Sequence, residues 1–274
     1  MIEEILRNVE ENKVLVHSIT NYVTVNDCAN IILASGSSPI MADDSDEVED
    51  ITSICSALVI NIGTLNKRTV EAMILAGKKS NELGHPVILD PVGAGASEFR
   101  NNTTMKLLEE ISFSVIRGNI SEIKFIAEGS ATTKGVDADA ADMVTADNLD
   151  SVIEFAKKLS KKTGAVIAIT GETDIVADSD KAYIIGNGHP MMSNVTGTGC
   201  MLTAVIGSYT GANPSKPLEA AATATAAMGL CGELAFERLQ QLDAGTNTYR
   251  MLLIDFMSKM NREILEGGAK IENR

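Results

Sequence analysis

Short apolar runs rich in β-branched residues alternate with longer stretches in which apolar positions recur at helical spacing. The runs predict strands at residues 14–18, 57–63, 86–93, 113–119, 164–171, 174–178 and 182–186. Several of them are apolar at consecutive positions, which is typical of parallel strands buried on both faces. The stretches between them predict helices at 22–35, 66–83, 101–111, 120–128 and 147–162. This alternation predicts βαβ crossovers and a mostly parallel sheet with helices on both sides.

The pattern changes after residue 186, where helical stretches follow one another without strands. Helices are predicted over 198–209, over the alanine-rich stretch 217–239 and over 246–264. Residues 128–147 are acidic and rich in small side chains, which favours a surface excursion with a marginal helix. Because no internal repeat or long linker interrupts the chain, we expect one domain over residues 1–274.

Charge and composition narrow the possible partners. The formal charge is 23 − 37 = −14, and no basic cluster occurs, which argues against binding to nucleic acid or to an anionic membrane. The apolar runs are well short of the ~18 residues of a membrane-spanning helix. The first residues, MIEEILRNVEENK, predict an amphipathic helix rather than a signal peptide. The four cysteines form no CxxC pair and no metal-ligand spacing: Cys28, Cys55, Cys200 and Cys231. We therefore expect a reduced, cytoplasmic protein.

Polar residues follow the predicted strands at the point where each apolar run ends. They are Asn21, Asn61, Gly63, Asp90, Arg117, Asn119, Thr170 and Glu172, with Glu122 three residues after Asn119. In an open parallel sheet, ligands bind outside the carboxyl ends of the strands. This set is richer than turn chemistry alone requires, although turns also favour Asn, Asp and Gly. The sequence therefore predicts a polar site at that edge of the sheet.

Each of these residues also has a purely structural interpretation. Asp90 precedes a proline, which is common turn chemistry. Glu122 could close a capping box with Asn119, or the same pair could face a hydrated Mg²⁺, which favours a few carboxylates with phosphate oxygens and water. Arg117 is harder to assign to structure alone, because a guanidinium offers a planar fork of donors to a phosphate. The histidines share no ligand spacing and are assigned structural roles: His17, His85 and His189.

The stretch NVTGTGCMLTAVIG, residues 194–207, combines two glycines with the start of an apolar helix. We predict that Gly197 and Gly199 both adopt positive φ, so that backbone N–H groups converge on an anion at the positive end of the helix. The alternative is an ordinary helix entry with Thr196 or Thr198 as the N-cap. No lysine follows the last glycine and a third glycine is missing, so the loop is neither a Walker loop nor a dinucleotide-binding fingerprint.

At these positions the sequence resembles the hydroxyethylthiazole kinase family. The resemblance rests on VHSITNYVTVNDCANIILASGSSPIMA, ALVINIGTL, VILDPVGAGAS, IRGNISEI, VIAITGE and VTGTGCMLTAVIG, which occur in order from about residue 14 to residue 210. It implies a ribokinase-like fold, a three-layer α/β/α domain without a separate lid. It also implies a homotrimer with active sites between subunits, and Mg²⁺-dependent transfer of phosphate from ATP to a thiazole alcohol in thiamin salvage.

The resemblance also implies roles for individual residues. Met41, Asn21 and Val23 belong to the thiazole pocket, and Gly197 is a substrate-binding glycine. Arg117 and Thr170 occupy positions that bind ATP. Asp90 and Glu122 are the acidic residues near Mg²⁺ and the phosphates.

Cys200 stands where sugar kinases of the wider superfamily carry an aspartate as general base. An ordinary thiol is mostly neutral near pH 7. The helix start would lower its pKa, whereas a nearby triphosphate would raise it. Our hypothesis is that Cys200 orients the alcohol and is a weak or optional base; the alternative is a small buried helix residue.

Other functions fit the same pattern of residues. A kinase of this fold could act on another small alcohol, such as hydroxymethylpyrimidine or a pyridoxal-like vitamer. A sugar kinase or a nucleotide-dependent hydrate-repair lyase is disfavoured, because both usually carry aspartate where this chain has Cys200. A nucleotide or vitamin sensor would not need the joint set of Asp90, Arg117, Glu122 and Gly197.

Overall fold

A nine-stranded sheet forms the centre of the computed structural model, which describes residues 1–129, 144–145 and 147–274. The strand order is β2-β1-β3-β4-β5-β6-β7-β8-β9. The strands are β1 (Leu15–Ile19), β2 (Ser38–Ile40), β3 (Ala57–Asn61), β4 (Val87–Asp90), β5 (Val115–Asn119), β6 (Val166–Thr170), β7 (Asp174–Ala177), β8 (Ala182–Ile185) and β9 (Ile271–Asn273). Strands β1 to β6 pair in parallel, and β7, β8 and β9 extend the sheet by antiparallel pairing. The prediction of a mostly parallel sheet is therefore confirmed.

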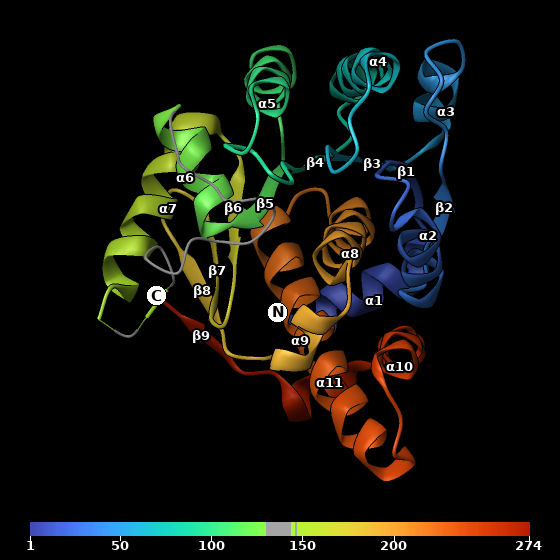
Figure 1. Ribbon diagram of the computed structural model, residues 1–274, viewed down its shortest axis with the longest axis vertical. Coiled ribbons are helices and arrows are strands. Elements are labelled where there is room, and N and C mark those ends of the chain that lie inside the picture. Colours follow the sequence, from blue (N-terminus) through green and yellow to red (C-terminus); the bar gives the residue numbers. More distant parts are fainter. Residues whose placement is uncertain (130–143, 146) are drawn as a thin grey trace.

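Helices cover both faces of this sheet (Figure 1). One face carries α3 (Val48–Ile54), α4 (Lys67–Leu83), α5 (Glu98–Glu110), α6 (Ile120–Glu128) and α7 (Leu149–Thr163). The other face carries α8 (Thr198–Ala212) and α9 (Pro217–Leu242), with α1 (Ile2–Asn12), α2 (Val25–Ala34), α10 (Thr246–Lys259) and α11 (Arg262–Gly268) packed around them. A 3-10 helix, η2 (Pro190–Asn194), leads into α8. The expected three-layer α/β/α fold is confirmed.

The two faces bury separate apolar clusters because side chains alternate along each strand. On β3, Val59 joins the cluster beneath α8 and α9, whereas Leu58 and Ile60 join the cluster beneath α4 to α7. Every residue of β3 is buried, as the consecutive apolar run predicts for a strand covered on both sides. No helix within the described ranges is long and apolar enough to cross a membrane.

The predicted final helix over 246–264 is wrong in one respect, because the structure divides it into α10 and α11. Met260 adopts an extended conformation, with φ −62° and ψ 127°. Asn261 then begins the next helix, where its side chain accepts a hydrogen bond from the Ile264 N–H at 3.0 Å. An asparagine that caps a helix competes with continuation of the preceding one, which is the physical reason for the break. The predicted excursion at 128–147 lies mostly outside the described residues.

Candidate active site

Two asparagines at neighbouring strand ends hold the thiol of Cys200. Asn21 lies two residues after β1, and Asn61 is the last residue of β3. The Nδ2 of Asn21 donates to Cys200 Sγ at 3.2 Å and to Asn61 Oδ1 at 3.0 Å. The Nδ2 of Asn61 donates to the same sulfur at 3.3 Å and to Asp90 Oδ2 at 2.8 Å. The sulfur is therefore placed by two buried amides that also bind each other.

The acceptor oxygens of both amides are occupied as well. Asn21 Oδ1 accepts from the Thr24 backbone N–H at 3.2 Å and from the Thr24 hydroxyl at 3.1 Å. Asn61 Oδ1 also accepts from the Gly63 N–H at 2.8 Å. With donors and acceptors both fixed, each amide has one orientation that satisfies all of its hydrogen bonds.

Asp90 ends β4 and is fully buried. Its Oδ2 accepts hydrogen bonds from Asn61 and, at 2.8 Å, from the Thr203 hydroxyl of α8. Its Oδ1 accepts no hydrogen bond of ordinary length from the described residues and lies 3.6 Å from Arg117 Nη1. Burial raises the pKa of Asp90, and the Arg117 charge opposes that shift. One oxygen of a buried carboxylate is thus left for a further partner.

Arg117 projects from β5 toward both Asp90 and the end of β6. Its Nη2 donates to the Thr170 hydroxyl at 2.6 Å, while its buried Nε has no hydrogen-bond partner within the described chain. The guanidinium also lies against Gly199, where an added Cβ would be 2.5 Å from Arg117 Nη1. This glycine therefore makes room for the arginine at the start of α8.

Glu122 closes the capping box that its spacing from Asn119 suggested. Its Oε2 accepts from the Asn119 N–H at 2.8 Å, and the Asn119 side chain accepts from the Glu122 N–H at 2.9 Å. The other oxygen, Oε1, accepts from the Gly93 N–H at 2.8 Å, which ties the loop after β4 to α6. Burial, followed by the negative charge of Asp90, raises the pKa of Glu122 to about 7. The capping role and the acidic site therefore coincide in one side chain.

The loop before α8 differs in part from the prediction. Gly197 has φ +91°, as expected, but Gly199 does not have positive φ and lies within the helix. The alternative N-caps are also wrong: Gly197 is the N-cap, and no side chain caps this helix. The Thr198 hydroxyl donates instead to the Met192 carbonyl at 3.2 Å, and Thr196 is exposed. The first backbone N–H groups of α8 consequently have no side-chain cap.

The environment of Cys200 decides the direction in which the pKa of its thiol shifts. Burial, and then the charge of Asp90, raises the pKa of the thiol, and the hydrogen bond from Asn21 and the charge of Arg117 oppose this. A thiol whose pKa is above the ordinary value stays protonated at neutral pH. Cys200 is therefore a neutral, half-buried group held toward the polar site.

The remaining predicted residues lie at the edges of this network. Met41 follows β2 and packs, half-buried, against the cluster beneath α8 and α9. Val23 is 57% exposed and Tyr22 beside it is 77% exposed. Glu172 is exposed in the turn after β6 and, within the described residues, forms no hydrogen bond or ion pair with Arg117 or Asp90.

Three residues that sequence reasoning missed support the site. Thr203 holds Asp90, as described above. Arg100 of α5 donates to the carbonyls of Ile62 and Gly63 at 2.6 and 2.7 Å, and so clamps the loop after β3. Asp174 accepts from the Gly171 N–H at 2.9 Å, and burial raises the pKa of Asp174 to about 7. None of them stands at the end of a parallel strand, the feature from which the site is predicted. Thr203 lies within the apolar pattern of a helix.

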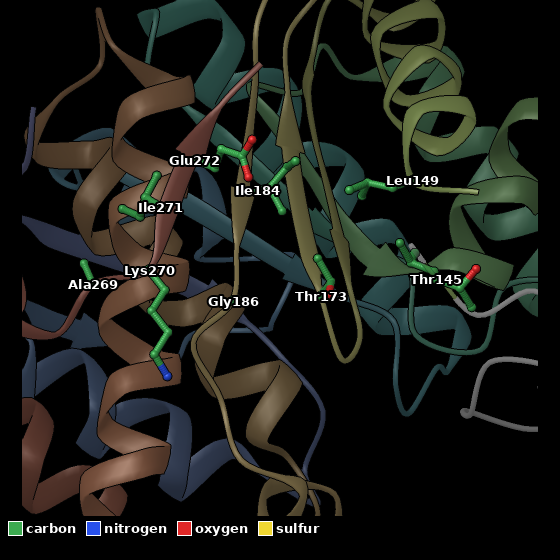
Figure 2. Close-up of a pocket in the computed structure, with 10 residues that line it drawn as sticks. Thr145, Leu149, Thr173, Ile184, Gly186, Ala269, Lys270, Ile271 and Glu272 are labelled. Atoms are coloured by element: carbon green, nitrogen blue, oxygen red, sulfur yellow. The ribbon is translucent and has the colours of Figure 1, made fainter. Parts of the chain in front are cut away.

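A separate pocket of ≈ 520 Å³ lies at the end of β8, beside the first turn of α7 (Figure 2). Its lining residues are Val144, Thr145, Leu149, Thr173, Ile184, Gly186, Ala269, Lys270, Ile271 and Glu272. None of them belongs to the network around Cys200, but Thr173 lies in the turn that follows Thr170. The pocket therefore opens at the same carboxyl edge of the sheet, on the side of Arg117.

The described residues contain no group of three or more His, Cys, Asp or Glu side chains that could enclose a metal ion. They do bring two acidic side chains, Asp90 and Glu122, close enough for one charge to shift the pKa of the other. Such a pair suits Mg²⁺, which binds one or two carboxylates and completes its shell with water and phosphate oxygens.

Comparison with known proteins gives consistent results. The family model described as "Hydroxyethylthiazole kinase family" matches residues 6–263. The hydroxyethylthiazole kinase of Clostridium acetobutylicum is 59% identical over 273 residues, covering 100% of both chains. That of Clostridium beijerinckii is 54% identical over 271 residues, covering 99% of this chain and 96% of the relative.

Solved structures agree in fold. The hydroxyethylthiazole kinase protein from Pyrococcus horikoshii OT3 superposes with a TM-score of 0.87 at 32% identity, over 100% of this chain and 98% of the other. The pyridoxal kinase from Staphylococcus aureus in complex with pyridoxal gives a TM-score of 0.57 at 15% identity, over 80% and 86%. The second likeness concerns the fold alone.

Proposed function

This chain belongs to the hydroxyethylthiazole kinase family, and from that membership we propose that it transfers the terminal phosphoryl group of ATP to the primary alcohol of 4-methyl-5-(2-hydroxyethyl)thiazole. The product would serve thiamin biosynthesis or salvage. The observation that carries the proposal is the placement of Cys200 Sγ between Asn21 and Asn61, one hydrogen bond away from Asp90. A hydroxyl in contact with that sulfur would stand at the start of α8, beside Arg117.

The phosphate donor would bind on the Arg117 side of the site. Arg117 and Thr170 are already hydrogen-bonded to each other, and the unpartnered Nε of Arg117 leaves donor capacity for a phosphate oxygen. The uncapped N–H groups of α8 would add the positive end of the helix dipole. The pocket near Thr173 would accommodate the nucleoside, because it opens beside the same turn.

Mg²⁺ would be held near Asp90 and Glu122. A divalent cation would offset both the repulsion between the two carboxylates and the cost of burying their charges. When bound, the ion would neutralise charge on the phosphate oxygens. The residues of the chain do the rest: Arg117 orients the donor, Gly197 lets the backbone approach the transferred group, and Cys200 orients the alcohol. Because phosphoryl transfer has a loose transition state, positioning rather than deprotonation by the thiol would supply most of the rate.

The acceptor side would be completed by Met41, Asn21 and Val23. Val23 and Tyr22 remain largely exposed at the margin of the network, and large exposed apolar side chains beside a site suit coverage by another subunit. We therefore propose that the protein is a homotrimer with active sites between subunits.

The deciding experiment is an ADP-release assay with Mg²⁺-ATP and four alcohols: the thiazole, hydroxymethylpyrimidine, pyridoxal and ribose. The expected result is turnover with the thiazole, with the phosphorylated product identified by phosphorus NMR. Turnover with another alcohol alone would transfer the substrate assignment to that compound. Absence of turnover with all four would favour a binding protein over a kinase.

A further inference from the structure

His17 is the middle residue of β1, and its ring is completely buried. Nε2 lies 2.9 Å from the Ala42 carbonyl oxygen, and Nδ1 lies 2.9 Å from the Thr52 hydroxyl. Because a carbonyl oxygen only accepts, Nε2 carries the proton and donates, and in the neutral ring Nδ1 accepts from Thr52. Burial lowers the pKa of His17, which favours this neutral form. Both ring nitrogens are therefore committed to structural partners.

The bond from Nε2 fixes the backbone directly after Met41. Strand β2 pairs with β1 as far as Ile40, which stands opposite His17, and the chain then leaves the sheet. Beyond that register the Ala42 carbonyl receives its hydrogen bond from the imidazole instead of from a neighbouring strand. Met41 is thus held between Ile40, which pairs with β1, and Ala42, whose carbonyl is bound by the His17 ring.

Thr52 extends the connection to a helix. It lies in α3, is 1% exposed, and its hydroxyl contacts His17. The buried hydroxyl and the buried imidazole satisfy each other by a hydrogen bond. Removal of either group leaves the other as a buried polar group without that partner, which costs free energy. The position of the segment after β2 is consequently coupled to α3 through a single ring.

We propose that His17 and Thr52 form a positioning pair that sets Met41 and thereby determines how tightly the acceptor alcohol binds, without taking part in phosphoryl transfer. The inference rests on the proposed function, in which Met41 lines the acceptor pocket. His17 is a positioning residue rather than a catalytic one, because its ring nitrogens contact neither Cys200 nor Asp90 but Ala42 and Thr52.

The test is steady-state kinetics with the thiazole and ATP varied separately. His17→Leu removes both bonds, of which only the one to the Ala42 carbonyl lies beside Met41. We therefore expect the KM for the thiazole to rise about tenfold, as loss of that one buried hydrogen bond implies, with kcat and the KM for ATP changed less than about threefold. His17→Gln keeps an amide donor for Ala42 and should recover most of the lost affinity.

Thr52→Val provides a milder variant in case His17→Leu does not fold. We expect it to raise the KM for the thiazole by about two- to fourfold. Thr225→Val is the matched control, since Thr225 is also 1% exposed but its hydroxyl bonds only the Ala221 carbonyl of its own helix. That control should leave both KM values unchanged.

A double-mutant cycle with Met41→Ala separates positioning from general loosening of the fold. If His17 acts through Met41, His17→Leu adds little to the KM for the thiazole in the Met41→Ala background. Full additivity, or an equal rise in the KM for ATP, would overturn the inference. The proposed function would still stand in that case, provided that the wild-type protein phosphorylates the thiazole. A wild-type protein that turns over no thiazole would overturn the proposed function itself, and this inference with it.

Discussion

At the scale of single residues, the site depends on groups whose ordinary chemistry is changed by burial. The thiol of Cys200 has a raised pKa, since burial and Asp90 outweigh the hydrogen bond from Asn21 and the charge of Arg117. Neither the helix start nor a triphosphate, the two effects considered from the sequence, is among these causes. The thiol is therefore better suited to hold a hydroxyl by a hydrogen bond than to remove its proton.

Replacement of Cys200 by alanine tests that role. We expect Cys200→Ala to lower kcat by less than about 100-fold, because an obligatory general base contributes ~10²–10⁴-fold. Cys231→Ala, which removes a buried thiol from α9, is the control and should leave kcat unchanged. A loss near 10⁴-fold in Cys200→Ala, restored by Cys200→Asp, would show instead that position 200 supplies the base.

The buried carboxylate of Asp174 makes stability depend on pH. Its pKa is about 7 in the folded protein and near 4 in an unfolded chain, so the folded state retains the proton between these values. Stability is then fully present below the unfolded pKa and is lost as pH rises toward 7, by at most about 1.4 kcal/mol per pH unit.

Urea denaturation at pH 5, 6, 7 and 8 measures this contribution. Relative to wild type, we expect Asp174→Asn to gain unfolding free energy as pH rises to about 7 and to gain no more above it. Asp180→Asn, at an exposed carboxylate in the turn between β7 and β8, is the control and should run parallel to wild type. Parallel curves for Asp174→Asn as well would contradict the raised pKa.

At the scale of elements, the first turn of α8 is shaped by what must lie against it. Gly199 has ordinary helical backbone, so its value is the space it leaves for Arg117 and not its conformational freedom. Because the clash would involve the far end of a flexible side chain, the arginine can move aside without unfolding the helix.

Gly199→Ala should therefore separate activity from stability. We expect the KM for ATP to rise about tenfold as Arg117 is displaced, while the free energy of unfolding changes by less than about 1 kcal/mol, since alanine also favours the helix. Gly267→Ala in α11, where an added Cβ meets nothing, is the control for both measurements. An unchanged KM for ATP in Gly199→Ala would contradict the assignment of Arg117 to the proposed donor site.

The parallel core of the sheet could be predicted from sequence because its physical signature is local. Strands β3 and β4 are buried at every position, and they appear as apolar runs up to their last residues, Asn61 and Asp90. Strands β2 and β9 have three residues each and no fully buried position, and pairing with a neighbour distant in sequence is what makes them strands. Edge strands of that kind leave too weak a pattern to predict.

The candidate site was predictable only as a set of strand ends. Asn61 and Asp90 end adjacent strands and stand opposite each other in register, which the topology implies. The bonds of both Asn21 and Asn61 to Cys200 depend on how α8 packs across the sheet, and no spacing in the sequence encodes that packing. Arg100 and Asp174 act through backbone carbonyl and N–H groups, which have no residue signature at all.

At the scale of the whole molecule, the number of subunits in the assembly bears on activity. From the proposed homotrimer we expect chains of 29.0 kDa to sediment as a trimer, with the exposed apolar side chains at the margin of the proposed acceptor site covered by a neighbouring subunit. Specific activity should fall on dilution as the trimer dissociates, and should return on concentration. A monomer that is fully active at nanomolar concentration would contradict shared sites.

The division of labour across the sheet has an evolutionary consequence. In the proposed function, the acceptor pocket would depend on β1, β2 and the segment that His17 holds, whereas the phosphate donor would depend on β5, β6 and the turn before β7. The halves meet at Asp90 and Cys200. With sites arranged in this way, a lineage could exchange one alcohol for another by altering an outer edge of the sheet, and still inherit the phosphate-donor side intact.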